Sequence, residues 1–92
     1  MSAFRTIWTT EDKYVEVIDQ RKLPHEWVVE KLISYKDAER AIKDMVVRGA
    51  PLIGATAAYG IYLAAREQNE KAYPNSFMND AFKALRASRP TA

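Results

Sequence analysis

The chain has 92 residues, a length typical of one small domain. Its 14 basic and 12 acidic residues leave a net charge of +2, a surplus too small to favour nucleic acid as a partner. The absence of cysteine excludes disulfides, thiolate metal ligands and a cysteine nucleophile within these residues, and it fits a reducing, cytoplasmic location.

The first third of the chain is predicted to be extended. Residues 6–9 (TIWT) and 14–19 (YVEVID) are rich in β-branched and aromatic side chains and flank the polar stretch TEDK. Residues 26–33 (EWVVEKLI) favour a third strand, although Val28 and Leu32 also fit a helical spacing. The sequence therefore predicts a β-meander over residues 4–33.

A helix is predicted over residues 35–47. Ser34 and Asp37 have the spacing of a capping box, with Asp as a weaker partner than Glu. Apolar residues then recur at helical spacing: Tyr35, Ala38, Ala41, Ile42 and Met45. We expect Arg48 in the last turn and Gly49 at the left-handed position that ends the helix.

Two more helices are predicted over residues 51–68 and 76–88. Pro51 suits the first turn of a helix, and Pro90 ends the last one. The longest apolar run, residues 50–65, is shorter than the ~20 residues that span a bilayer, so we expect a buried helix and no membrane partner. Small residues should let neighbouring elements approach this helix closely: Gly54, Ala55, Ala57, Ala58 and Gly60.

Together these elements predict the α+β class, with a small antiparallel β-sheet followed by three helices in one domain over residues 1–92. The chain stops directly after a helix, on the small and apolar residues of SRPTA. We expect natural domain ends to be polar and mobile, which predicts that the domain is truncated after Ala92.

The stretch VRGAP (residues 47–51) is the main candidate for a functional site. A helix that begins after Gly49 presents free N–H groups and partial positive charge, and Arg48 could add a charge-assisted grip on a phosphate. Arg89 could supply a second grip if its helix end lies nearby. Ordinary helix capping explains the same residues, and from the residues alone it is the favoured interpretation. The GxxxxGK[ST] and GxGxxG signatures are absent.

Other candidate residues point to structural roles. His25 is the only histidine and has no partners at metal-ligand spacing, so no metal site is expected. Asp19 is expected to bond the local backbone of the loop that it precedes. Three aromatic residues are expected to belong to the core rather than to a base-stacking surface: Trp8, Trp27 and Tyr59.

Three segments resemble the methylthioribose-1-phosphate isomerase family in order and spacing. They are DQRKLP (residues 19–24), AIKDMVVRGAPLIGATAAYG (41–60) and SRPTA (88–92). The resemblance covers nearly the whole chain. It implies the N-terminal domain of a two-domain protein whose larger, Rossmann-like C-terminal domain, with the catalytic cysteine and aspartate, is absent here.

The resemblance implies a cofactor-independent aldose–ketose isomerase of methionine salvage, which converts 5-methylthioribose 1-phosphate to 5-methylthioribulose 1-phosphate. It implies that Arg48, Gly49, Ala50 and Arg89 contact the substrate and that no catalytic residue lies in this chain. The expected partners are the sugar phosphate, the missing C-terminal domain and a second copy in a homodimer. The chain alone should be inactive.

Two alternatives remain within the same superfamily. One is a non-enzymatic subunit similar to the regulatory subunits of the eukaryotic initiation-factor exchange complex. The intact RGAPLIGATAAYG favours the enzyme, because a protein without a sugar-phosphate substrate does not need the site. The other alternative is a ribose-1,5-bisphosphate isomerase, for which an additional basic residue near C5 of the sugar would be expected.

Overall fold

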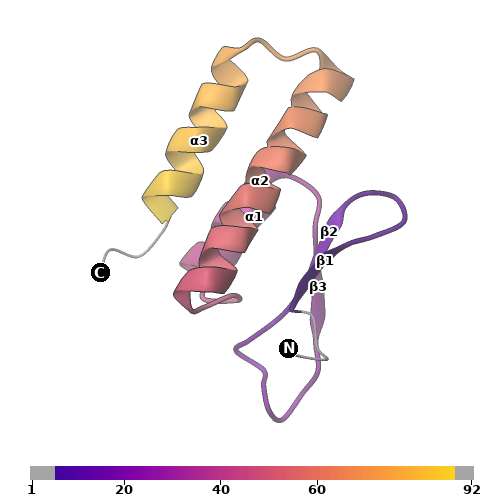
Figure 1. Ribbon diagram of the computed structural model, residues 1–92, viewed down its shortest axis with the longest axis vertical. Helices are drawn as coiled ribbons and strands as arrows, with labels where there is room; N and C mark the ends of the chain where they lie inside the picture. Colours follow the sequence, from indigo (N-terminus) through magenta and orange to yellow (C-terminus); the bar gives the residue numbers. More distant parts are fainter. Residues whose placement is uncertain (1–5, 89–92) are drawn as a thin grey trace.

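The computed structural model describes residues 6–88. Three strands precede three helices: β1 (Ile7–Thr9), β2 (Val15–Ile18), β3 (Val29–Leu32), α1 (Tyr35–Lys43), α2 (Ala50–Lys71) and α3 (Ser76–Ser88). The helices lie together on one side of the sheet (Figure 1). This arrangement confirms the predicted α+β class, and α3 has the predicted bounds.

The strands form an antiparallel sheet in the order β1-β2-β3. Val17 is opposite Ile7 on one side, and Val15 is opposite Leu32 on the other. Val15, Val17 and Leu32 are almost fully buried, because this face of the sheet packs against the helices. The meander is confirmed for residues 6–33, including the third strand, whose spacing alone also fitted a helix. Residues 4 and 5 lie outside the described residues.

Helix α1 begins as predicted but ends early. The Ser34 hydroxyl accepts a hydrogen bond from the Asp37 N–H, and the Asp37 carboxylate accepts from the Ser34 N–H, so the capping box is present. The helix ends at Lys43, and Met45 takes the left-handed conformation with φ of 61°. This early turn lets Val46 and Val47 enter the core. The predictions that α1 reaches residue 47, with Arg48 in its last turn and Gly49 at its end, are therefore wrong, although Gly49 has the expected positive φ, of 87°.

Helix α2 is the central element of the helical layer, and it begins and ends slightly outside the predicted residues 51–68. At Gly60 the helix is so close to its neighbours that a Cβ would lie 3.0 Å from the Cβ of Ala38 in α1. The predicted close approach is confirmed there. It is wrong for Gly54, where a Cβ would meet nothing within 4 Å, and Ala58 is exposed. No helix within residues 6–88 is long and apolar enough to cross a membrane.

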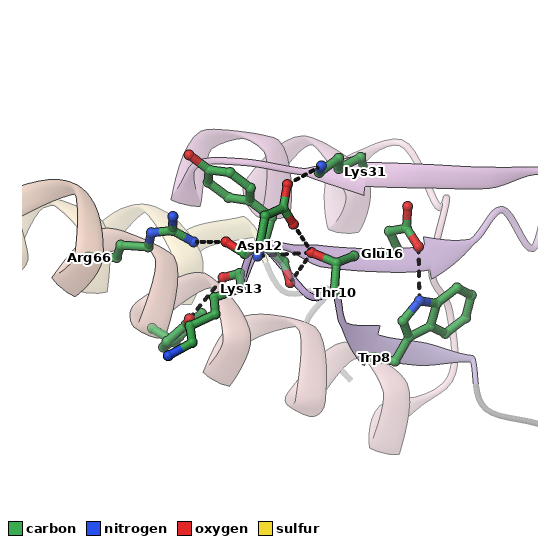
Figure 2. Close-up of polar contacts among 9 residues, drawn as sticks. Trp8, Thr10, Asp12, Lys13, Glu16, Lys31 and Arg66 are labelled. Carbon is green, nitrogen blue, oxygen red and sulfur yellow. Dashed lines mark hydrogen bonds and ion pairs between the residues drawn. The ribbon is translucent and has the colours of Figure 1, made fainter.

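The loop between β1 and β2 is bound to the middle of α2, as Figure 2 shows. The Arg66 Nη1 donates to the Asp12 carbonyl oxygen at 2.8 Å, and the Tyr62 hydroxyl donates to the Lys13 carbonyl oxygen at 2.8 Å. The Arg66 guanidinium also lies 4.0 Å from the centre of the Tyr14 ring. These three contacts join the sheet to the helices, and we call them the hairpin clamp.

Candidate anion-binding site

Arg48, Gly49 and Ala50 lie together where the connection from α1 reaches α2. Val46 and Val47, which precede them, are only 5% and 1% exposed, whereas these three residues are all exposed. The two valines anchor the connection in the core. The predicted Arg-Gly-Ala stretch is therefore exposed to solvent and directly follows two buried residues.

Within residues 6–88, no side chain caps the beginning of α2. Gly49 is the N-cap residue, with φ of 87° and ψ of 135°, a conformation that favours glycine. The first turn of the helix contains no acidic residue. The first helical bond runs from the Ile53 N–H to the Gly49 carbonyl oxygen at 2.9 Å. The N–H groups of Ala50 and Leu52 come before this first bond, so they have no acceptor within the helix and can donate hydrogen bonds to an anion.

Arg48 adds a cation beside this helix end. Within residues 6–88, no hydrogen bond or ion pair engages its exposed guanidinium. A guanidinium carries five N–H donors in a planar fork that matches the oxygens of a phosphate. Arg48 and the start of α2 therefore carry a positive charge and unpaired donors of the kind that anion-binding sites use.

The fourth predicted residue, Arg89, lies outside the described residues. The described part of α3 ends at Ser88, whose hydroxyl donates to the Leu85 carbonyl oxygen at 2.8 Å. Helix α3 runs back along α2 toward the end where α2 begins, and its last turn lies beside the middle of α2, where Leu85 is close to Gly60 (Figure 1). The structure thus brings Arg48, Gly49 and Ala50 together and does not describe the position of Arg89.

A second charged group lies in the loop after β2, which we call the Asp19 loop (residues 19–22). Asp19 is fully buried, and its carboxylate accepts from the Arg21 backbone N–H at 3.0 Å, from Nε at 3.0 Å and from Nη2 at 2.8 Å. The bonds from the Arg21 side chain lower the pKa of Asp19 below its ordinary value and raise the pKa of Arg21. The predicted local backbone bond is confirmed, but sequence reasoning missed the ion pair.

The Asp19 loop touches the connection that carries Arg48. The Gln20 N–H donates to the Val46 carbonyl oxygen at 2.7 Å. Residues 20 and 46 belong to different segments, and no spacing in the sequence indicates that they meet. The sequence feature that indicates a structural role for this loop is an acidic residue, Asp19, placed directly after an apolar strand.

The structure also locates the histidine and the aromatic residues that were considered as candidates. His25 is exposed in a loop, and residues 6–88 hold no group of three or more His, Cys, Asp or Glu side chains arranged for a metal. Trp8 and Tyr59 are partly buried, and Tyr59 packs against the core. Trp27 is 62% exposed, so its prediction as a core residue is wrong. It lies two residues before β3, in the loop that connects β2 to β3.

No family model matches the chain. A methylthioribose-1-phosphate isomerase of Paramagnetospirillum magneticum is 53% identical over 90 residues, which are 97% of this chain and 24% of that protein. One of Desulfatibacillum aliphaticivorans is 44% identical over 91 residues, which are 97% of this chain and 25% of that protein. The chain thus spans about a quarter of the length of the curated relatives that it matches.

Two solved structures share the fold. The crystal structure of 5-methylthioribose 1-phosphate isomerase from Pyrococcus horikoshii superposes with a TM-score of 0.81 at 40% identity, covering 95% of this chain and 25% of that chain. The crystal structure of translation initiation factor eIF-2B, subunit delta, from A. fulgidus superposes with a TM-score of 0.80 at 34% identity. The match covers 97% of this chain and 26% of that chain. Over the residues that align, the chain is therefore similar to methylthioribose-1-phosphate isomerases in both sequence and fold.

Proposed function

We propose that the chain is the phosphate-binding part of an aldose–ketose isomerase that converts 5-methylthioribose 1-phosphate to 5-methylthioribulose 1-phosphate. Arg48 and the N–H groups of Ala50 and Leu52 hold the phosphate, and Arg89 adds a second guanidinium. The observation that carries the proposal is the start of α2, which no side chain of residues 6–88 caps and which follows an arginine, in a chain 53% identical over 90 residues to a named isomerase. The homodimer and the cytoplasmic location implied by the resemblance are part of this proposal.

The proposal divides the reaction between two parts of a longer protein. Isomerisation moves hydrogen between C1 and C2 of the ring-opened sugar, which needs an acid and a base, or a dry pocket that permits hydride transfer. Within residues 6–88, no hydrogen bond joins Arg48 or the neighbouring exposed Asp44 to a second titratable side chain. The chain therefore binds and orients the phosphate, and a second, larger domain supplies the reacting groups. Holding a remote phosphate aligns the reacting carbons.

A second candidate function is a non-enzymatic subunit of the kind named for the A. fulgidus structure. The observation in its favour is the TM-score of 0.80, nearly equal to the 0.81 for the isomerase. Fold similarity therefore does not separate the two functions. The curated relatives at 44–53% identity, which carry the isomerase name, favour the enzyme.

A chimera tests the isomerase directly. The matching quarter of the Paramagnetospirillum enzyme is replaced by this chain, and turnover of 5-methylthioribose 1-phosphate is measured. We expect an active chimera in which Arg48→Ala lowers kcat/KM by a factor that corresponds to about 2–4 kcal/mol of lost transition-state stabilisation, because a charge-assisted contact in a closed site is lost. Lys71→Ala, at the far end of α2 and roughly 30 Å away, is the matched charge control and should leave kcat/KM unchanged.

Binding by the 92-residue chain separates the two parts of the proposal. Titration with inorganic phosphate, followed by the amide signals of Arg48, Gly49 and Ala50, should report binding while the chain alone shows no turnover. Turnover by the purified chain would overturn the division of labour. A folded, inactive chimera together with an unresponsive Arg48 region would instead support the non-enzymatic subunit.

A further inference from the structure

Backbone hydrogen bonds fix the beginning of the Asp19 loop. The Asp19 N–H donates to the Val28 carbonyl oxygen of the long loop that leads into β3, at 2.8 Å, and the Lys22 N–H donates to the Asp19 carbonyl oxygen at 3.2 Å. The buried carboxylate then accepts from the Arg21 backbone N–H and from two N–H groups on one edge of its guanidinium, Nε and Nη2. The Arg21 side chain is 44% exposed, so only the acid is buried, and removing its charge would weaken the side-chain bonds that hold Arg21 in the loop.

This rigid loop supports the connection between α1 and α2 from the side of the sheet. The Gln20 N–H lies between the two residues of the ion pair, and it is this group that bonds the Val46 carbonyl oxygen at 2.7 Å. Arg21 also faces Asp44 of the same connection, whose charge helps to raise the Arg21 pKa. Two residues after Val46 the chain reaches Arg48. A hydrogen bond and the attraction of opposite charges therefore join the Asp19 loop to the connection between α1 and α2.

We infer that Asp19 is a positioning residue for the anion site: through Arg21 and the Gln20 N–H it fixes the segment 46–49 that presents Arg48 and the start of α2. The inference rests on the proposed function for its consequence in binding. Its structural content, that Asp19 orders a segment 27 positions away in the chain, stands on the contacts alone. The Asp19 loop therefore contributes to binding although none of its residues needs to contact the ligand.

The experiment compares Asp19→Asn with wild type in the 92-residue chain. Asparagine keeps the shape of the side chain but loses the charge that holds the guanidinium. Amide hydrogen exchange at residues 20 and 47, whose N–H groups donate to the Val46 and Ala41 carbonyl oxygens, should become about tenfold faster in the variant relative to the amides of α3. The dissociation constant for inorganic phosphate should rise roughly three- to tenfold, because the ordered segment must now be assembled on binding.

Asp12→Asn is the matched control. Asp12 also forms an ion pair, with Lys31 at 2.7 Å, but in the loop at the opposite end of β2. Asp12→Asn should leave exchange at residues 20 and 47, relative to the amides of α3, and the phosphate affinity unchanged even where it lowers global stability. If Asp19→Asn fails to fold, Arg21→Lys replaces it, since lysine keeps the charge but not the fork, and it should change both readouts in the same direction by less.

The outcomes separate the inference from the proposed function. Equal exchange at residues 20 and 47 in Asp19→Asn and Asp12→Asn overturns the positioning role. Faster exchange in a protein whose wild type binds no phosphate supports the positioning of the segment and refutes the proposed function. Faster exchange with unchanged phosphate affinity shows that the loop orders the segment without preparing the site, and it overturns the inference.

Discussion

Gly60 of α2 lies directly against Leu85 of α3, where a Cβ at position 60 would stand 2.8 Å from the Leu85 Cδ1. The same Cβ would also meet Ala38 of α1 at 3.0 Å. The leucine tip can rotate, but a Cβ attached directly to the α1 backbone cannot move without shifting that helix. The three helices therefore meet at a point that has no room for one further methyl group.

Gly60→Ala should lower the free energy of unfolding by about 1–3 kcal/mol, since overpacking outweighs the better helix propensity of alanine. Gly54→Ala is the control in the same helix. Its added methyl meets nothing within 4 Å, so it should raise the free energy of unfolding by about 0.5–1 kcal/mol. Urea denaturation measures both. A stabilised Gly60→Ala protein would show that the helices are not in contact there.

The capping box of α1 predicts an order of effects. The Asp37 carboxylate accepts from the Ile33 N–H at 2.9 Å and from the Ser34 N–H at 3.3 Å, whereas the Ser34 hydroxyl accepts one bond at 3.4 Å. Ser34→Ala should cost about 0.5–1 kcal/mol and Asp37→Ala about 1–2 kcal/mol. Denaturant unfolding of both variants tests the order, and a larger cost for Ser34→Ala would contradict it.

The hairpin clamp predicts a local loosening when its arginine is removed. Arg66→Ala should speed amide exchange at residues 11–13 by roughly tenfold and leave exchange in α1 nearly unchanged. Arg66→Lys keeps the charge over the Tyr14 ring but loses the fork that reaches the Asp12 carbonyl, so it should give an intermediate effect. Uniform acceleration along the whole chain would indicate global unfolding instead of a local clamp.

Two aspartates predict acid sensitivity. Hydrogen bonds from Lys31 and then Thr10 hold the pKa of Asp12 at about 2, below its ordinary 3.8, and Arg21 lowers the pKa of Asp19. Both carboxylates are better stabilised as anions in the folded state. Their contribution is therefore complete above the unfolded pKa near 3.8 and is lost as the pH falls through the folded values.

The melting temperature should accordingly stay level at neutral pH and fall as the pH drops from about 4 toward about 2. The double variant Asp12→Asn, Asp19→Asn should be less stable at neutral pH and show a shallower fall over this window. Calorimetry across the pH range measures both slopes. Parallel curves for wild type and the double variant would assign the acid sensitivity to other carboxyl groups.

Local patterns predicted most of the fold because they act over a few residues. The Ser34–Asp37 spacing located the start of α1, and alternating Val15 and Val17 located the central strand. The end of α1 was missed because the burial of Val46 and Val47, a tertiary effect, turns the chain at Met45 despite the left-handed backbone it requires there. Glycine at position 49 was read as the end of one helix, and it is the start of the next.

The candidate site was predictable only in part. An arginine and a glycine before a helix are visible in the sequence, and the family resemblance singled them out. The support from the Asp19 loop was not visible, because the bond from Gln20 to Val46 depends on how two separate segments fold. A pattern of residue types can indicate which groups meet a ligand, but not which groups hold them in place.

The hairpin clamp has a kinetic consequence. Each strand pairs with the next strand in the chain, so the sheet forms from contacts close in sequence. The bonds from Arg66 and Tyr62 instead close loops of 54 and 49 residues, which makes them entropically expensive early in folding. They should form after the rate-limiting barrier, so loss of the clamp should accelerate unfolding and leave the folding rate almost unchanged.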